Sequence, residues 1–544
     1  MRFLPKNDKL QHFLDRLSGK IEEKYIWIEG YYKQLLSLAL HHRIIVLLIA
    51  LVAFVGGLGL TKFIGKEFMP SEDQSRFVIR LQMPVDYSVD EVDRMGKRVE
   101  EVLRKFPEVT SILYSQGGGL TREPNKANAM INLKPKSQRK KSQEQIKAEM
   151  RKAIRAIPGI RASVENVSMI GGGQRQTAIL YSIRGRDLKN LEGYTRDIVS
   201  QFSKLPGIVD LDSSLETGKP EVRVFIDRDK AADLGVDVAS VAESVNFLIS
   251  GEVDVTKFKD EAKGRRYDVR VRLNPQDRVN PDDLGRLYVR AKDGRLVQVS
   301  NVASFQEGGG SSIISRVDRQ RAVTLFANLE GKPLGKAKDE LDGISQKVLT
   351  ADYSGRYKGQ ADVMAESFGY LMFAMLLGII MAYMVLAAQF ESFGQPVIVL
   401  LSMPFSFIGA FGALFVFNQT LNIFSFIGLI LLMGLVKKNA ILLVDYTNVL
   451  RERGLPLREA VIQAGPVRLR PILMTTLAMI LGMMPIAIGI GEGAETRAPM
   501  AMATIGGLLT SLFLTLVVVP VAYDLFEEHK EKRKMKKELT GVHP

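Results

Sequence analysis

Apolar stretches long enough to cross a bilayer alternate in this chain with segments whose apolar residues recur at strand or helix spacing. A membrane-spanning helix needs about 20 mainly apolar residues. The first such stretch stands alone, and the others cluster near the end of the chain. Six stretches meet this length: 42–63, 368–388, 396–417, 423–450, 471–490 and 500–526. The pattern therefore predicts one span, a large water-soluble domain, and a membrane domain of five spans at 366–526.

The water-soluble segment repeats a strand–helix–strand pattern four times. Alternating apolar residues predict strands, and apolar residues every three or four positions predict helices. The predicted helices of the four units are 89–104, 143–156, 188–205 and 335–349. Four such units are typical of two α+β sandwiches of the ferredoxin-like, split βαβ kind, in which helices cover one face of each sheet. We assign the first sandwich to 64–174 and the second to 175–219 and 309–365.

A segment with a different pattern of predicted strands and helices, 220–308, interrupts the second sandwich. Alternation predicts strands at 221–227 and 267–273, and helical spacing predicts a helix at 238–249 with Asp237 placed to cap it. A hairpin is predicted at 287–299, around the turn formed by Lys292, Asp293 and Gly294. This segment is expected to protrude as a separate subdomain.

The first 41 residues predict an amphipathic helix rather than a cleaved leader. Apolar residues recur at helical spacing, and Trp27, Tyr31 and Tyr32 lie near the entrance to the first span. A coiled-coil seam is the alternative, because the spacing is nearly heptad. Basic residues crowd the connection after the fourth span and the tail at 527–544, which the positive-inside rule places in the cytoplasm. Both termini are then cytoplasmic and 64–365 is exported, with the first span acting as an uncleaved anchor.

Composition narrows the chemistry. The 544 residues carry a net charge of +14, include no cysteine, and have five histidines, all near the termini. The basic excess lies partly beside the spans, so lipid explains it and nucleic acid is not needed as a partner. The absence of cysteine excludes thiolate sites, and no histidine cluster in the body of the chain suggests a zinc or catalytic site. No cofactor is predicted.

Two lysines, Lys437 and Lys438, lie near the middle of the fourth span. Each charged lysine at the centre of a membrane helix costs about 2.5–3.5 kcal/mol, so such residues are normally functional and paired. The alternative is a helix end from which the lysines reach the headgroups. The only acid well inside a span is Asp445, seven residues after Lys438 and on the same helix face. One acid cannot balance these cations, so a partner polypeptide or another segment is expected to supply carboxylates.

Three motifs carry a family resemblance: 434–445 (GLVKKNAILLVD), 467–478 (VRLRPILMTTLA) and 68–74 (FMPSEDQ). They resemble the carboxy-terminal half of a resistance-nodulation-division (RND) efflux pump of the hydrophobe/amphiphile, AcrB-like type, in which the proton-motive force drives export. The resemblance covers nearly the whole chain. It implies proton-relay roles for a set on the fourth and fifth spans: Lys437, Lys438, Asn439, Asp445, Arg468 and Thr475. The essential carboxylate pair of the family lies on the other half, which this chain does not contain.

The same resemblance places a gate loop at 116–124, for which an ordinary strand-to-strand loop is the alternative. Predicted gate and substrate residues are Leu113, Gln116, Gly117, Gly118, Gly119, Leu120 and Met130. Four of these, Leu113, Gly118, Leu120 and Met130, stand where the family often has phenylalanine. An aliphatic or lipid-like substrate is therefore expected instead of an aromatic drug.

The resemblance further implies a transporter subunit of the bacterial inner membrane, not an enzyme. Its expected partners are an amino-terminal-half RND subunit with an intramembrane Asp pair, a periplasmic adaptor and an outer-membrane channel, in a trimer-based assembly. Two alternatives remain open: a split protein-export factor like the SecD and SecF pair, and an assembly scaffold that does not transport.

Overall fold

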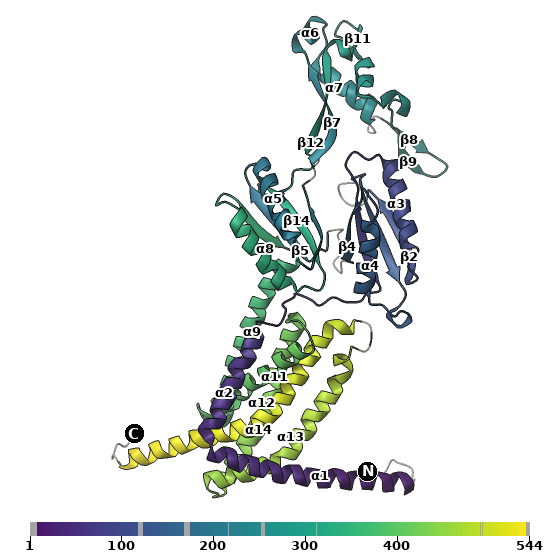
Figure 1. The fold of residues 1–544 in the computed structure, drawn as a ribbon. Helices are drawn as coiled ribbons and strands as arrows, with labels where there is room; N and C mark the ends of the chain where they lie inside the picture. Colours follow the sequence, from purple (N-terminus) through teal and green to yellow (C-terminus); the bar gives the residue numbers. More distant parts are fainter. Residues whose placement is uncertain are drawn as a thin grey trace.

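The molecule has three tiers: a helical bundle, two α+β sandwiches above it and a small outer lobe beyond them (Figure 1). The structure is a computed structural model. It describes residues 8–117, 123–167, 175–215, 217–251, 256–311, 313–489, 491 and 493–539.

Six helical segments of the described chain are long and apolar enough to cross a membrane, which confirms that prediction. The bundle helices are α2 (Arg43–Leu60), α9 (Gln360–Phe390), α10 (Gln395–Leu400) with α11 (Ser402–Val416), α12 (Ile423–Glu452), α13 (Leu457–Ala487) and α14 (Ala494–Leu539). Helix α13 begins at Leu457, before the predicted start of the fifth span at 471, and contains Pro466 and Pro471. Hydropathy marks only the apolar part of a helix, and α13 and α14 continue beyond it.

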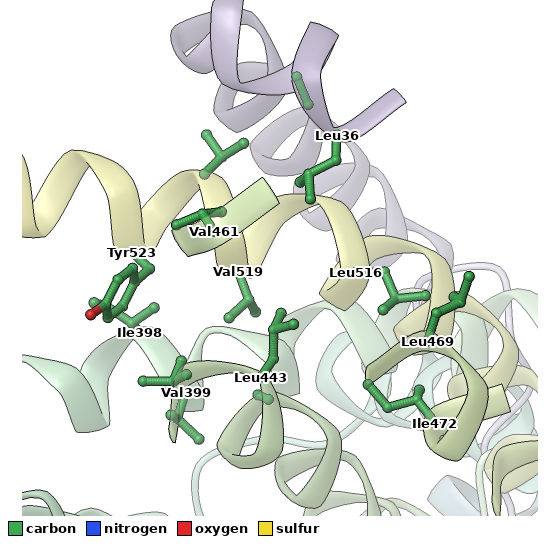
Figure 2. Packing of buried hydrophobic residues seen from close by; sticks show 14 of the residues in the cluster. Leu36, Ile398, Val399, Leu443, Val461, Leu469, Ile472, Leu516, Val519 and Tyr523 are labelled. Carbon is green, nitrogen blue, oxygen red and sulfur yellow. The ribbon is translucent and has the colours of Figure 1, made fainter. Parts of the chain in front are cut away.

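Helix α14 is the centre of the bundle and packs against α11, α12 and α13 (Figure 1). Gly409 of α11 and Gly506 of α14 lie where these two helices cross, and a Cβ on Gly409 would be 2.1 Å from the Gly506 carbonyl oxygen. Only glycine permits this approach, as is usual where membrane helices pack closely. Figure 2 shows the apolar side chains of this core, among them Leu443, Leu469 and Leu516.

Helix α1 (Asp8–His41) lies across the end of the bundle that faces away from the sheets (Figure 1). Tyr32 is buried there, and its hydroxyl donates a hydrogen bond to the Leu516 carbonyl oxygen over 2.8 Å. The opposite side of α1 exposes Trp27, Tyr31 and Leu38. One apolar face is thus packed and another is open, as an interfacial helix requires; its contact with lipid stays a prediction.

Sandwich 1 is a four-stranded antiparallel sheet in the order β2-β3-β1-β4, with two helices packed on it. Its elements are β1 (Arg76–Gln82), α3 (Val89–Leu103), β2 (Val109–Gln116), β3 (Lys126–Leu133), α4 (Gln143–Arg155) and β4 (Arg161–Asn166). Along β1, Phe77, Ile79 and Leu81 are buried in the core shared with the helices. Because side chains alternate along a strand, Val78 and Arg80 point to the other face of the sheet.

Sandwich 2 repeats this arrangement with strands from both sides of the insertion. Its sheet has the order β13-β14-β5-β15, and β6 also pairs with β14. Its elements are β5 (Ile179–Gly185), α5 (Leu188–Phe202), β6 (Ile208–Ser213), β13 (Arg316–Val317), β14 (Gln320–Leu329), α8 (Leu334–Val348) and β15 (Ser354–Lys358). The two sandwiches stand side by side above the bundle (Figure 1).

A two-stranded ribbon carries the chain from sandwich 2 to the outer lobe and back (Figure 1). The described lobe contains β7 (Thr217–Ile226), α6 (Arg228–Asp233), α7 (Val238–Val245), β8 (Lys257–Asp260), β9 (Arg265–Asp268), β10 (Tyr288–Arg290), β11 (Leu296–Gln298) and β12 (Ala303–Ser311). The predicted hairpin is present as β10 and β11.

Two details predicted for the outer lobe are wrong. The strand expected at 267–273 is β9, which ends at Asp268, because only 265–268 pair with β8. Alternation supplied apolar residues here, but Tyr267 and Val271 remain exposed, and the ladder with β8 ends at Asp268. Asp237 does occupy the N-cap position of α7, yet its side chain makes no capping hydrogen bond.

Candidate functional site

Helix α12 is fixed at its start by a capping box. Asn422 is fully buried, and its side-chain oxygen accepts hydrogen bonds from the Phe424 and Ser425 backbone N–H groups, both over 3.0 Å. The Ser425 hydroxyl in turn accepts from the Asn422 N–H over 2.8 Å. This pairing satisfies helix-end donors that would otherwise be orphaned. The start of α12 is therefore well defined, and the lysines lie about four turns along it.

Lys438 lies on a face of α12 that the other described residues leave open. Exposed residues recur along that face at spacings of three, four or seven positions: Ile427, Leu431, Gly434, Lys438 and Asp445. Asp445 shares the face with Lys438, as predicted, but the two side chains form no ion pair. Lys437 is half-buried, and Asn439 is buried on the packed side.

Within the part of the chain that the structure describes, neither Lys437 nor Lys438 has an Asp or Glu within 4.0 Å. Two arginines of the bundle are paired: Arg43 with Asp524 over 3.0 Å, and Arg451 with Glu527 over 3.0 Å. Lys437 and Lys438 instead share with Arg468 the lack of an acid partner among the described residues.

The neighbouring helix α13 brings Arg468 close to α12, whereas the hydrogen bonds of Thr475 stay within α13. The Arg468 guanidinium lies 4.5 Å from the centre of the Tyr446 ring, and its Nε is buried without a hydrogen-bond partner among the described residues. The Thr475 hydroxyl donates within its own helix to the Pro471 carbonyl oxygen over 3.0 Å. The predicted relay residues therefore share two adjacent helices without being joined by hydrogen bonds.

A second site is the cleft of about 1000 Å³ between the two sandwiches. Its lining mixes apolar side chains with charged ones. Leu113 and Met130, which the sequence predicts as substrate residues, belong to this lining; their contact with substrate stays a prediction. The other apolar members include Val78, Ile313 and Phe326, and the charged members include Arg155, Arg161, Arg175 and Asp212.

The predicted gate residues separate into two groups. Gln116 does not face the cleft: its amide donates hydrogen bonds to the carbonyl oxygens of Val89, over 3.0 Å, and Pro124, over 3.2 Å. Gly117 adopts a positive φ of 63°, which glycine allows at a strand end. Gly118, Gly119 and Leu120 lie outside the described residues.

The floor of the cleft is a buried ionic network that joins the sandwiches. Asp210 of β6 accepts hydrogen bonds from Arg151 Nε, over 2.9 and 3.0 Å, and from the Val164 N–H over 3.0 Å. Within sandwich 2, Asn328 donates to the same carboxylate over 3.1 Å. Asp210 has a positive φ of 51°, at a position where the register of β6 against β14 shifts. This bulge aims the carboxylate at sandwich 1.

The sequence did not predict two features of the cleft and one ion pair of the bundle. It missed Asp210 because no local pattern shows that β6 and α4 meet. It missed Phe326, whose ring lies 4.1 Å from the Arg175 guanidinium, and so underestimated the aromatic content of the cleft. It also missed the Arg43–Asp524 pair, for which the available signal was an acid near the end of the last apolar stretch.

Comparison with known proteins identifies the family. The AcrB/AcrD/AcrF family profile matches residues 2–527. The chain belongs to the AcrB/AcrD/AcrF family. This match confirms the predicted resemblance to RND efflux transporters.

Two curated relatives of this AcrB/AcrD/AcrF family member are called multidrug resistance protein MdtC. The protein from Erwinia tasmaniensis is 32% identical over 482 residues, which are 87% of this chain and 46% of the relative. The protein from Erwinia amylovora is 31% identical over 492 residues, which are 89% of this chain and 48% of the relative. The chain thus spans about half the length of the curated relatives it matches.

The fold is also similar to two crystal forms of a heavy metal efflux pump. Each is 26% identical to this chain with a TM-score of 0.83, and the likeness covers 92% of this chain and 52% of that one. Proteins described as multidrug resistance and heavy metal efflux pumps thus resemble the same chain. The fold alone does not identify the substrate.

Proposed function

We propose that this chain is the lysine-bearing half of a proton-driven efflux pump that exports hydrophobic or amphiphilic compounds. The observation that carries the proposal is Lys438: it lies near the middle of α12, on an open face, with no acid of the described chain within ion-pair distance. An unpaired ammonium facing lipid would be costly. Membership of a family of efflux transporters supplies the context in which such a charge is used.

The open face of α12 has the shape and charge of a helix-docking surface. Gly434 lets a partner backbone come close, and Ile427 and Leu431 supply apolar contacts on the same side. A partner helix suited to this face carries carboxylates at the level of Lys438. An amino-terminal-half RND subunit or segment with an intramembrane Asp pair has this chemistry.

Proton transfer at the Asp pair of the partner would drive movement of the helices. Ionised carboxylates attract Lys438 and hold the partner helix against α12. When the carboxylates take up protons from outside, the attraction is lost and the helices repack. Arg468 adds positive charge on α13, and Thr475, Lys437, Asn439 and Asp445 complete the polar set around the relay. The energy source is the proton-motive force, and no cofactor is required.

The cleft between the sandwiches is the proposed substrate site. Leu113, Met130 and Phe326 offer apolar contacts, and the arginines at its floor suit a polar or charged end group. A metal substrate is less well supported, because the described residues contain no group of three or more His, Cys, Asp or Glu that could hold an ion. An amphiphile matches both parts of the lining.

The topology proposed for the assembly follows from the basic residues. Arg453, Arg458 and the basic last turns of α14 lie at the α1 end of the bundle, which the positive-inside rule places in the cytoplasm. Both termini then face the cytoplasm of a bacterium, and the sandwiches enter the periplasm as porter subdomains. The outer lobe would serve as a docking subdomain in a trimer-based assembly with a periplasmic adaptor and an outer-membrane channel.

The test replaces Lys438 in the natural assembly and measures export of an amphiphilic dye from vesicles under an imposed pH gradient. We expect Lys438→Ala to abolish proton-dependent export while the assembly stays intact by native gel. Lys33→Ala, which removes an exposed lysine of α1, is the matched control and should export normally.

Undiminished export by Lys438→Ala would support the scaffold alternative, in which the lysine only orders helices. Transport of unfolded polypeptide instead of dye would support the split protein-export alternative. The family match favours efflux over both.

A further inference from the structure

The segment that leads from α2 into sandwich 1 contacts two other parts of the molecule. We call residues 64–68 the strap. On one side the strap pairs with the turn before α12: the Leu421 N–H donates to the Gly65 carbonyl oxygen over 2.7 Å, and the Glu67 N–H donates to the Leu421 carbonyl oxygen over 3.1 Å. The Ile423 N–H completes this ladder by donating to the Phe68 carbonyl oxygen over 3.2 Å.

Side chains reinforce the contact between the strap and α12. The Thr420 hydroxyl donates to a Glu67 carboxylate oxygen over 3.1 Å. Asn422, which caps α12, donates to the Thr420 carbonyl oxygen over 3.1 Å. The strap is therefore attached to the residues that fix the start of α12.

On its other side the strap is pressed against the start of α8 in sandwich 2. The Gly335 N–H donates to the Lys66 carbonyl oxygen over 2.9 Å. A Cβ on Gly335 would lie 3.0 Å from the Lys66 Cβ, and a Cβ on Gly65 would lie 2.4 Å from Pro333 Cγ. A side chain at Gly65 would therefore force the strap away from the start of α8, and one at Gly335 would make an unusually tight contact with Lys66.

We propose that the strap transmits movement of α12 directly to sandwich 2, so that Gly65 and Gly335 are positioning residues for energy coupling. Lys438 lies 16 residues after Asn422, which is about 24 Å of rigid helix. A shift of α12 at Lys438 therefore displaces the turn at Leu421, and the ladder carries this displacement to the strap and on to α8.

This route complements the connection through α9. Helix α9 continues from β15 of sandwich 2, and its Phe368 packs against Phe426 of α12 with ring centres 4.9 Å apart. That contact can slide, because it is apolar and has no fixed direction. The strap is joined by directional hydrogen bonds on both sides and thus fixes the direction of the movement.

The inference rests on the proposed function, and its test separates the two. The chain has no cysteine, so spin labels placed at Glu101→Cys on α3 and Gln346→Cys on α8 meet no competing site on this chain, and a sample without the two substitutions gives the background of the assembly. Pulsed EPR on the natural assembly in vesicles then reports the distance between the sandwiches. We expect Lys438→Ala to shift this distance distribution in the otherwise native protein.

The strap is tested by repeating that comparison in Gly335→Ala and Gly65→Ala backgrounds. We expect the shift caused by Lys438→Ala to fall to less than half in both, and to be kept in Gly343→Ala, where a Cβ on the same helix meets nothing within 4 Å. Thr420→Val removes the hydroxyl donor at nearly constant size and should reduce the shift even if the glycine variants fail to assemble.

If Lys438→Ala shifts the distance between the spin labels fully in the Gly335→Ala, Gly65→Ala and Thr420→Val backgrounds, the role proposed for the strap is wrong. The role proposed for the relay would be unaffected. Absence of any shift from Lys438→Ala in the otherwise native protein would overturn the relay, and with it the role given to the strap.

Discussion

At the scale of the residue, the buried charge of Asp210 lies where the two sandwiches meet. Asp210 is fully buried and bonds to both sandwiches, whereas most ion pairs of the sandwiches lie on their surfaces. Exposed pairs contribute about 0–1 kcal/mol, but removing one member of a buried pair costs about 3–5 kcal/mol. We therefore expect Asp210 to stabilise the contact between the two sandwiches.

We predict that Asp210→Ala loosens the contact between the sandwiches and lowers the free energy of unfolding by about 3 kcal/mol, because Arg151 loses its main partner. The measurement is the thermal unfolding midpoint of the purified assembly. Asp318→Ala removes an exposed acid paired with Arg184 and is the matched control, with little expected change. Equal midpoints for the two variants would contradict the prediction.

Asp73 offers a prediction with a definite pH dependence. Burial raises the pKa of Asp73, but hydrogen bonds from Arg139 and from the Gln143 and Ser75 backbone N–H groups outweigh it and hold that pKa below its ordinary value. A depressed pKa means that this stabilisation is full above the unfolded pKa of about 3.9 and is lost as pH falls through the lower folded pKa.

Asp73→Asn should therefore destabilise sandwich 1 by about 2 kcal/mol at pH 7, since these are hydrogen bonds to a charged group. The difference in stability between the variant and the native protein should become smaller as the pH is lowered below 4. Thermal unfolding across this pH range checks it, and a difference that stays constant would show that the charge of Asp73 is not the cause.

At the scale of the element, the sequence predicts best the parts that depend on local patterns. The four helices of the sandwiches and the six spans follow from apolar spacing, and they are found close to the expected positions. The predicted end of β9 is wrong, because a strand depends on a pairing partner. The start of helix α13 was not predicted, because it depends on how far the helix extends beyond the apolar stretch. Local periodicity carries neither kind of information.

The crossing of α11 and α14 gives a prediction for an element contact. Gly409→Ala places a methyl group 1.5 Å from the Thr510 hydroxyl oxygen and 2.1 Å from the Gly506 carbonyl oxygen, so the helices must separate. The thermal stability of the purified protein should fall by several degrees. Gly412→Ala on the same helix meets nothing within 4 Å and should leave stability unchanged or higher. A fall of equal size in both variants would refute this account of the crossing.

At the scale of the whole molecule, the sites are made by contacts between distant segments. Leu113 and Met130 were predicted as substrate residues and do line the cleft, but its charged floor joins α4 to β6, 59 positions apart, and Phe326 comes from β14. The relay residues were predicted individually from a motif. Their arrangement, with Lys438 facing outward and Arg468 over Tyr446, required the packed helices.

The central claim is that another membrane helix, bearing carboxylates, covers the open face of α12. Photocross-linking from a photoreactive amino acid placed at Leu431 in the natural assembly tests it most directly. The account predicts cross-links to a segment outside this chain that carries intramembrane Asp or Glu at the level of Lys438. Cross-links to lipid alone, or only to a second copy of this chain, would contradict it.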